Sequence, residues 1–186
     1  MSFQIIGGRF KGHALQSPPE STTRPTKSIV RGSVFNICQS WIDGASVLDL
    51  FAGSGAIGLE ALSRGAASAL FIEKNHTVVR TLRANIEKLG VVAQVWELDV
   101  CTACQRLQKE GRQFDLIYID PPYDKGLDRE ALLAAEGLLS ERGLLFVEES
   151  SRGKEEWAQL PLQHLRWQRS RVFGDTRLQE FSRIQI

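Results

Sequence analysis

The residues best suited to chemistry are Asp120, Pro121, Pro122 and Tyr123, which follow an apolar stretch over residues 114–119. A carboxylate at a strand end, two prolines that stiffen the turn and an aromatic ring suit the positioning of a flat, amino-bearing group for in-line attack. The Asp120 carboxylate and the Pro121 carbonyl can accept its two N–H groups, while the Tyr123 ring stacks on its plane. An Asp-Pro turn also ends strands in many proteins without such a role. The interpretation of this motif therefore depends on what stands beside it.

A second motif lies upstream, in Asp49-Leu-Phe-Ala-Gly-Ser-Gly-Ala-Ile-Gly58. Its glycines follow G-x-G-x-x-G between a predicted strand and a predicted helix, the pattern of a nucleotide-binding loop. Glycine lets the backbone approach the ligand closely. In a dinucleotide enzyme the helix N-terminus would carry the pyrophosphate, whereas S-adenosyl-L-methionine has no phosphate and would place its amino-acid tail and ribose against the loop. The loop alone leaves both cofactors open.

Three acidic residues fall where predicted strands end. Asp49 lies in the end of the first strand, Glu73 ends the second and Asp99 follows the third. Open α/β sheets bind ligands at this carboxyl edge, so we expect Glu73 to accept both ribose hydroxyls, Asp99 the adenine amino group and Asp49 the cofactor's ammonium. Asp49 and Asp99 could instead be turn or helix-capping residues, and Glu73 would serve an NAD ribose equally well. The full set of expected cofactor residues is Asp49, Phe51, Gly53, Gly55, Glu73, Lys74, Asp99 and Asp120.

These motifs sit in a chain whose pattern predicts an α/β fold with a doubly wound, mostly parallel sheet. From residue 45 onward, predicted strands at 46–51, 69–72, 93–98, 114–119 and 144–147 alternate with predicted helices at 56–64, 77–89, 102–110 and 128–139. Residues 165–173 and 177–186 predict a closing antiparallel hairpin. Upstream, the pattern predicts a small hairpin over 3–15 and a helix from Pro25 toward Trp41. We therefore divide the chain into a basic extension, 1–42, and a catalytic domain, 43–186.

Composition and charge set limits on the possible function. The 186 residues are 42% hydrophobic and 24% charged, as in ordinary folded soluble proteins, and no apolar run is long enough to span a bilayer. The N-terminus lacks the pattern of a secretory signal, so we expect a cytoplasmic protein. The cysteines Cys38, Cys101 and Cys104 are an odd set, which predicts reduced thiols, and the Cys101–Cys104 pair has no neighbouring histidine. We expect no bound metal.

The net charge of +1 is unevenly distributed along the chain. Residues 1–40 carry a local charge of +4, and the remainder therefore carries −3. Such asymmetry predicts a basic arm for a polyanion such as RNA, although these could also be ordinary solvating charges. The residues that give this local charge are Arg9, Lys11, Arg24, Lys27 and Arg31, set against Glu20.

The two motifs, in this order, resemble those of the amino-methyltransferases in the S-adenosylmethionine-dependent superfamily, whose fold is a seven-stranded relative of the Rossmann sheet. Further segments resemble the bacterial 16S ribosomal RNA guanine-N2 methyltransferases of the small subunit. These segments cover nearly the whole chain: 5–15, Thr23-Arg-Pro-Thr26 leading to Arg31, Phe35-Asn-Ile37, 49–65, 120–123 and Phe173-Gly-Asp-Thr176. Two departures are visible, since Gly32 stands where an acidic residue is usual and Phe173 where tyrosine is common.

The resemblance implies methylation of the exocyclic N2 of one guanine by a monomer that acts on 16S ribosomal RNA in a small-subunit ribonucleoprotein. It implies no metal and no membrane. Residues 120–123 would hold the base, and S-adenosyl-L-methionine would be the methyl donor. The implied RNA-binding residues are Arg9, Lys11, Arg24, Thr26, Lys27 and Arg31.

Three alternatives remain open from the sequence. DNA adenine or cytosine amino-methyltransferases, and those acting on a glutamine amide, share the pattern at 120–123, but the DNA enzymes usually carry a larger recognition domain. An NAD(P)-dependent oxidoreductase shares only the glycine loop. A non-catalytic RNA-binding or assembly module would keep the cofactor pocket without turnover.

Overall fold

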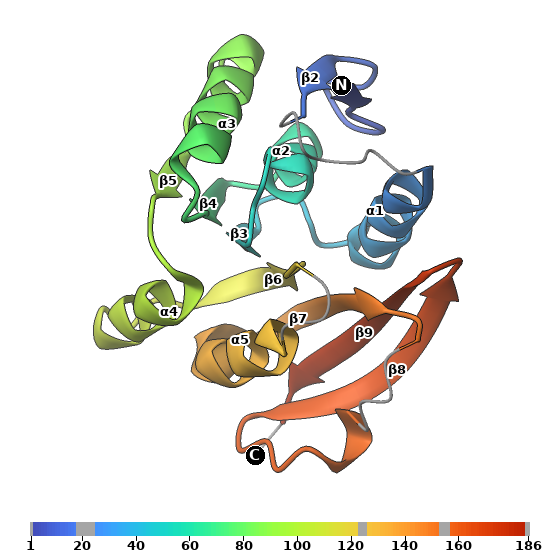
Figure 1. Cartoon of the computed structure of the whole chain (residues 1–186), viewed down its shortest axis with the longest axis vertical. Helices are drawn as coiled ribbons and strands as arrows, with labels where there is room; N and C mark the ends of the chain where they lie inside the picture. Colours follow the sequence, from blue (N-terminus) through green and yellow to red (C-terminus); the bar gives the residue numbers. More distant parts are fainter. Residues whose placement is uncertain (1, 18–24, 123–125, 153–156, 185–186) are drawn as a thin grey trace.

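The computed structural model describes residues 2–17, 25–122, 126–152 and 157–184 (Figure 1). Seven strands form one sheet in the order β5-β4-β3-β6-β7-β9-β8, in which β9 runs antiparallel to its neighbours β7 and β8 and the remaining pairs are parallel. The predicted fold class is confirmed. The strands are β3 (Ser46–Leu50), β4 (Ser68–Ile72), β5 (Gln94–Trp96), β6 (Phe114–Ile119), β7 (Leu139–Ser150), β8 (Leu165–Phe173) and β9 (Thr176–Arg183).

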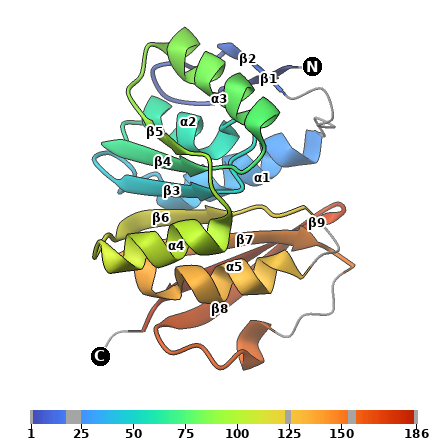
Figure 2. The same ribbon diagram turned by 60° about the vertical axis from the view of Figure 1, so that its left-hand side comes forward.

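Helices cover both faces of this sheet because its parallel strands bury both of their sides (Figures 1 and 2). Val47 packs with the first group of helices, whereas the next residue, Leu48, packs with the second. This alternation follows from the period of two along a strand. The first group is α1 (Pro25–Cys38), α2 (Ala56–Ser63) and α3 (His76–Leu89), and the second is α4 (Val100–Lys109) and α5 (Leu127–Ala135).

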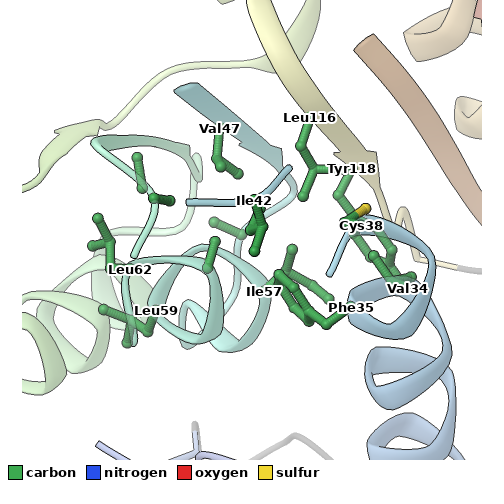
Figure 3. Packing of buried hydrophobic residues seen from close by; sticks show 14 of the residues in the cluster. Val34, Phe35, Cys38, Ile42, Val47, Ile57, Leu59, Leu62, Leu116 and Tyr118 are labelled. Carbon is green, nitrogen blue, oxygen red and sulfur yellow. The ribbon is translucent and has the colours of Figure 1, made fainter. Parts of the chain in front are cut away.

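Figure 3 shows how α1 joins this core. Val34 and Phe35 are fully buried and belong to the same cluster as Leu59 of α2 and Leu116 of β6. The N-terminal hairpin, β1 (Ser2–Gln4) and β2 (Ala14–Gln16), adds two further buried residues to this cluster, Ile5 and Leu15. Residues on both sides of the expected boundary between 42 and 43 therefore share one core.

The predicted helix over 128–139 is wrong at its end. Helix α5 stops at Ala135, a short 3-10 helix covers Glu136–Leu138, and Leu139 begins β7. Leu139 pairs with Phe114 of β6, so a partner distant in sequence decides its conformation. None of the helices in the described ranges has the length and apolar character needed to cross a membrane.

Candidate active site

A cavity of about 500 Å³ lies at the carboxyl ends of the parallel strands. It brings Glu73, which follows β4, together with Asp120 and Pro122, which follow β6. The expected residues Phe51 and Lys74 line it as well, with Ile72, Asn75, Val78, Leu98, Val100 and Leu127. The two motifs thus meet in one cavity. Gly53, Gly55, Asp49 and Asp99 lie outside this lining.

The glycine loop has a backbone that needs glycine. Gly55 adopts a φ of 85° at the N-cap of α2, and a Cβ at this position would collide with the Leu82 side chain. Phe51 also lies in the left-handed region, with a φ of 59°, although it is not a glycine. A non-glycine residue in this conformation is uncommon and is often found at functional sites. Phe51 lines the cavity.

Glu73 is held in place by backbone donors. Gly53 N donates to Oε2 at 3.1 Å, and Asn75 N donates to Oε1 at 2.8 Å. Each carboxylate oxygen keeps a further acceptor position for a ligand. The structure therefore presents Glu73 at the cavity as a fixed acceptor.

Asp49 and Asp99 both make the helix-capping contacts that were the alternative interpretation. Asp49 is 3% exposed, and its Oδ2 accepts a hydrogen bond from Gly58 N in the first turn of α2 at 3.0 Å. Asp99 is the N-cap of α4 and accepts from Cys101 N at 3.0 Å. It also lies 3.5 Å from the Lys74 ammonium. Asp99 is exposed and can still contact a ligand, whereas Asp49 lies beneath the loop.

Burial raises the pKa of Asp49 to about 8; the Gly58 hydrogen bond opposes this rise, and the nearby Asp120 and Glu73 carboxylates add to it. The folded state therefore keeps a proton on Asp49 between about pH 4 and pH 8, where the unfolded chain has lost it. We expect the stability contributed by this proton to fall as pH rises through that window. Urea unfolding gives the free energy of unfolding at pH 5 and at pH 8. This free energy should fall less between the two pH values in Asp49→Asn than in the wild type, and an equal fall would contradict the prediction.

Asp120 follows β6 directly, as the sequence predicts. Its Oδ2 accepts a hydrogen bond from the Lys27 ammonium of α1 at 3.0 Å. Lys27 was expected on an RNA-facing arm, and the structure brings it to the edge of the cavity. Tyr123 lies outside the described residues, as do Arg24 and the side chain of Thr26.

Arg31 is not where the sequence places it. It was expected to face RNA, but it is only 4% exposed. Its Nη2 donates to Gln4 O at 2.7 Å, and its Nε lies 3.4 Å from the Glu60 carboxylate. A buried carboxylate from α2 turns this arginine inward. Arg31 is a structural residue that joins α1 to the hairpin and to α2.

Arg9 and Lys11 lie beside the last turn of α2. Arg9 N donates to Ser63 O at 2.8 Å, and Ser63 ends the helix whose N-cap is Gly55. A helix of eight residues is about 12 Å long, so these two basic residues are separated from the glycine loop by the length of α2.

The comparisons with known proteins decide the family. A family model described as "Conserved hypothetical protein 95" matches residues 3–182. The chain belongs to this family. It is 39% identical over 147 residues to "Ribosomal RNA small subunit methyltransferase D" of Escherichia coli strain K12, a match that covers 78% of this chain and 73% of that protein.

Solved structures agree with this family. The structure of "Putative methyltransferase yhhF" of Escherichia coli has a TM-score of 0.83 at 33% identity, with both chains fully covered. A "SAM Dependent Methyltransferase" of Agrobacterium tumefaciens has a TM-score of 0.67 at 15% identity, and the match covers 86% of this chain and 63% of that chain. At this identity the likeness shows the fold alone. The resemblance drawn from the motifs is confirmed, and the fold is that of S-adenosylmethionine-dependent methyltransferases.

Two residues of this family member were not singled out from its sequence. Glu60 is fully buried on α2, where it accepts hydrogen bonds from Ile6 N and Arg64 Nε, both at 2.8 Å. Asn85 of α3 is 1% exposed and donates to Gln16 O and to Ser54 O in the glycine loop. These two residues tie the N-terminal hairpin to helices α2 and α3. The sequence offered one signal for each of them, a polar residue on the otherwise apolar side of its helix.

The charges of the cavity also separate the two cofactor interpretations. Glu73 and Asp120 line it, and Lys74 is the single basic residue in the lining that the structure describes. A dinucleotide would bring a pyrophosphate toward these carboxylates, which is unfavourable. S-adenosylmethionine carries a sulfonium and an ammonium, which suit them. Among the described residues, no group of three His, Cys, Asp or Glu side chains is placed to hold a metal ion.

Proposed function

We propose that this chain transfers a methyl group from S-adenosylmethionine to the exocyclic N2 of one guanine in 16S ribosomal RNA. The proposal includes a cytoplasmic monomer acting on a small-subunit ribonucleoprotein. The observation that carries it is the single cavity shared by Glu73 and by Asp120 with Pro122. The relative named "Ribosomal RNA small subunit methyltransferase D" supports the substrate class.

The cavity residues fit this cofactor. When bound, S-adenosylmethionine supplies an electrophilic methyl carbon on a sulfonium, which makes a good leaving group because it departs as a neutral sulfide. Glu73 would accept the ribose hydroxyls, and the exposed Asp99 would accept the adenine amino group. Leu98 and Val100 offer apolar contacts to the adenine ring. Gly53 and Gly55 let the loop backbone approach the cofactor's tail.

The proline turn would act on the base. An exocyclic amino group is a poor nucleophile because its lone pair is delocalised into the ring. Hydrogen bonds to the Asp120 carboxylate and the Pro121 carbonyl would hold both N–H groups and orient the nitrogen, with the Tyr123 ring stacked on the base. The proton can leave after the methyl group has moved, so Asp120 need not be a full general base.

The RNA must present this amino group outside a helix. The N2 of a paired guanine cannot be reached inside the stack, so the target would be an unpaired or extruded nucleotide. The basic residues would contact phosphates and supply affinity rather than base identity. With so small an N-terminal extension, we infer that a preshaped ribonucleoprotein provides much of the specificity.

The deciding experiment is incorporation of a labelled methyl group from S-adenosylmethionine into small subunits from cells that lack this gene, followed by nucleoside analysis. We expect N2-methylguanosine. No incorporation despite cofactor binding would favour the non-catalytic assembly module, and transfer to DNA or to a glutamine amide instead would favour the other amino-methyltransferases.

The same assay tests the catalytic carboxylate. We expect Asp120→Ala still to bind S-adenosylmethionine but to lose methyl transfer by at least about tenfold, because one positioned contact worth about 1.4 kcal/mol in the transition state is removed. Asp43→Ala, at an exposed site before β3, is the matched control and should keep full activity. Full activity in Asp120→Ala would remove this carboxylate from the mechanism.

A further inference from the structure

Two arginines of the C-terminal hairpin lie on the same face of the sheet as Asp120. The pairing register carries Glu148 of β7 to Leu178 of β9 and on to Arg171 of β8. On the other side, Ile119 pairs with Val147, so Asp120 follows β6 at the level of Glu148. Neighbouring strands are about 4.8 Å apart, which places Arg171 three strand positions, or about 14 Å, from Asp120 in one row.

Arg169 lies in the next row on the same face. It pairs with Glu180 of β9, which pairs with Phe146 of β7. Helix α1 contacts β8 on this face, and Figures 1 and 2 both show the tip of the β8–β9 hairpin beside α1. Lys27 of α1 reaches Asp120 from the same face. Lys27 at the cavity edge and the two arginines of the hairpin therefore lie on one face, with Glu148 and Leu178 between them in the register.

We propose that Arg169 and Arg171 form a second RNA-binding surface, which holds backbone phosphates that flank the target nucleotide. The inference rests on the proposed function, because it takes ribosomal RNA as the substrate. It adds a contact that the basic N-terminal arm does not provide, since Arg9 lies at the far end of α2 from the glycine loop.

A buried carboxylate prepares these two guanidinium groups for binding. Glu180 is 3% exposed; its Oε2 accepts a hydrogen bond from Arg171 Nη1 at 2.6 Å, and its Oε1 lies 3.5 Å from Arg169 Nε. One carboxylate against two arginines leaves a net positive charge. Each guanidinium has five N–H donors and keeps several of them for a phosphate. Because the side chains are already held, less conformational entropy is lost when RNA binds.

The acidic cavity favours such a surface, even though Asp120 is already paired with Lys27. RNA that places a base beside Asp120 brings its own phosphates toward Asp120 and Glu73, which repel them. Cations close to the cavity offset this repulsion. A different explanation is that charges on the edge strand β8 prevent it from pairing with another chain. That explanation predicts self-association when an arginine is removed, with RNA affinity unchanged.

The test is Arg169→Ala in the full chain, with binding to small subunits from cells lacking the gene measured at several salt concentrations. The Arg169 side chain is 62% exposed, and Glu180 keeps its bond to Arg171. One lost phosphate contact should make the slope of log affinity against log salt shallower by about 0.7–0.9 than in the wild type. The ratio of wild-type to variant affinity should then be about five- to eightfold larger at 0.1 M salt than at 1 M. Affinity for S-adenosylhomocysteine should not change.

Arg142→Ala is the matched control, because it removes the same charge from an exposed position near the start of β7, at the opposite end of that strand from Glu148. Its subunit affinity and salt slope should equal those of the wild type. An equal loss in both variants, or no loss in Arg169→Ala, would overturn this surface while methylation by the wild type still supported the proposed function. If the wild type itself neither bound nor methylated the subunits, both proposals would fail together.

Discussion

Replacement of Glu60 by alanine is expected to lower the free energy of unfolding by about 3–5 kcal/mol, the cost of leaving a buried charge without its partner. Glu60 is fully buried and lies between Arg31 and Arg64. Without it, the Arg31 guanidinium stays in the interior with no carboxylate, and Ile6 N loses its acceptor. The N-terminal hairpin and α1 would both lose a contact to α2. Urea unfolding followed by circular dichroism measures the change.

The chain offers a matched control for this variant. Glu110 also forms a pair with an arginine four residues away, Arg106, at the same distance of 2.8 Å, but both side chains are exposed. Glu110→Ala should cost only about 0.3–0.5 kcal/mol. Glu60→Gln keeps an acceptor for Ile6 N and should fall between the two. A loss in Glu60→Ala no larger than in Glu110→Ala would show that the buried pair is not a structural link.

The end of the sheet that carries the cavity could be predicted from sequence because its signals are local. The strand over 114–119 is apolar apart from Asp115, and the structure reproduces its bounds. Parallel strands end at the same edge, so the residues after β4 and β6 had to approach one another. The shared cavity of Glu73 and Asp120 follows from that topology.

Positions decided by distant partners could not be predicted in this way. Arg31 belongs to a basic stretch of sequence, and only the approach of Glu60 and the Gln4 carbonyl shows that it is buried. Leu139 continues a helical pattern, but pairing with Phe114 makes it a strand residue. Both errors arise because local pattern carries no information about which element packs opposite.

The same distinction applies to the basic residues. A local charge of +4 in residues 1–40 suggested one RNA-facing arm. In three dimensions, Arg31 is internal, Lys27 meets Asp120, and Arg9 lies at the far end of α2. Net charge along a sequence therefore does not define a surface, and the sheet register, which links Arg171 to the row of Asp120, is needed to do so.

Glu73→Ala is expected to lower the affinity for S-adenosylhomocysteine by about a hundredfold. A carboxylate that accepts two ligand hydroxyls forms two charge-assisted hydrogen bonds, each worth about 1.5–3 kcal/mol, and even a loss of about 2.7 kcal/mol corresponds to this factor. The loss of the acceptor for Gly53 N adds to the effect, since one of the hydrogen bonds that hold the glycine loop at the end of β4 would be gone, while Ala52 N keeps its bond to Ile72 O. Isothermal titration calorimetry measures the affinity.

Glu97→Ala provides the control, because Glu97 follows the neighbouring strand β5 at the same edge, is bonded to His76 and does not line the cavity. It should bind S-adenosylhomocysteine like the wild type. Glu73→Gln should lose less affinity than Glu73→Ala, since one amide oxygen can still accept from Gly53 N while the second acceptor is gone. Unchanged affinity in Glu73→Ala would mean that the ribose is held elsewhere, and the cavity would then serve the base alone.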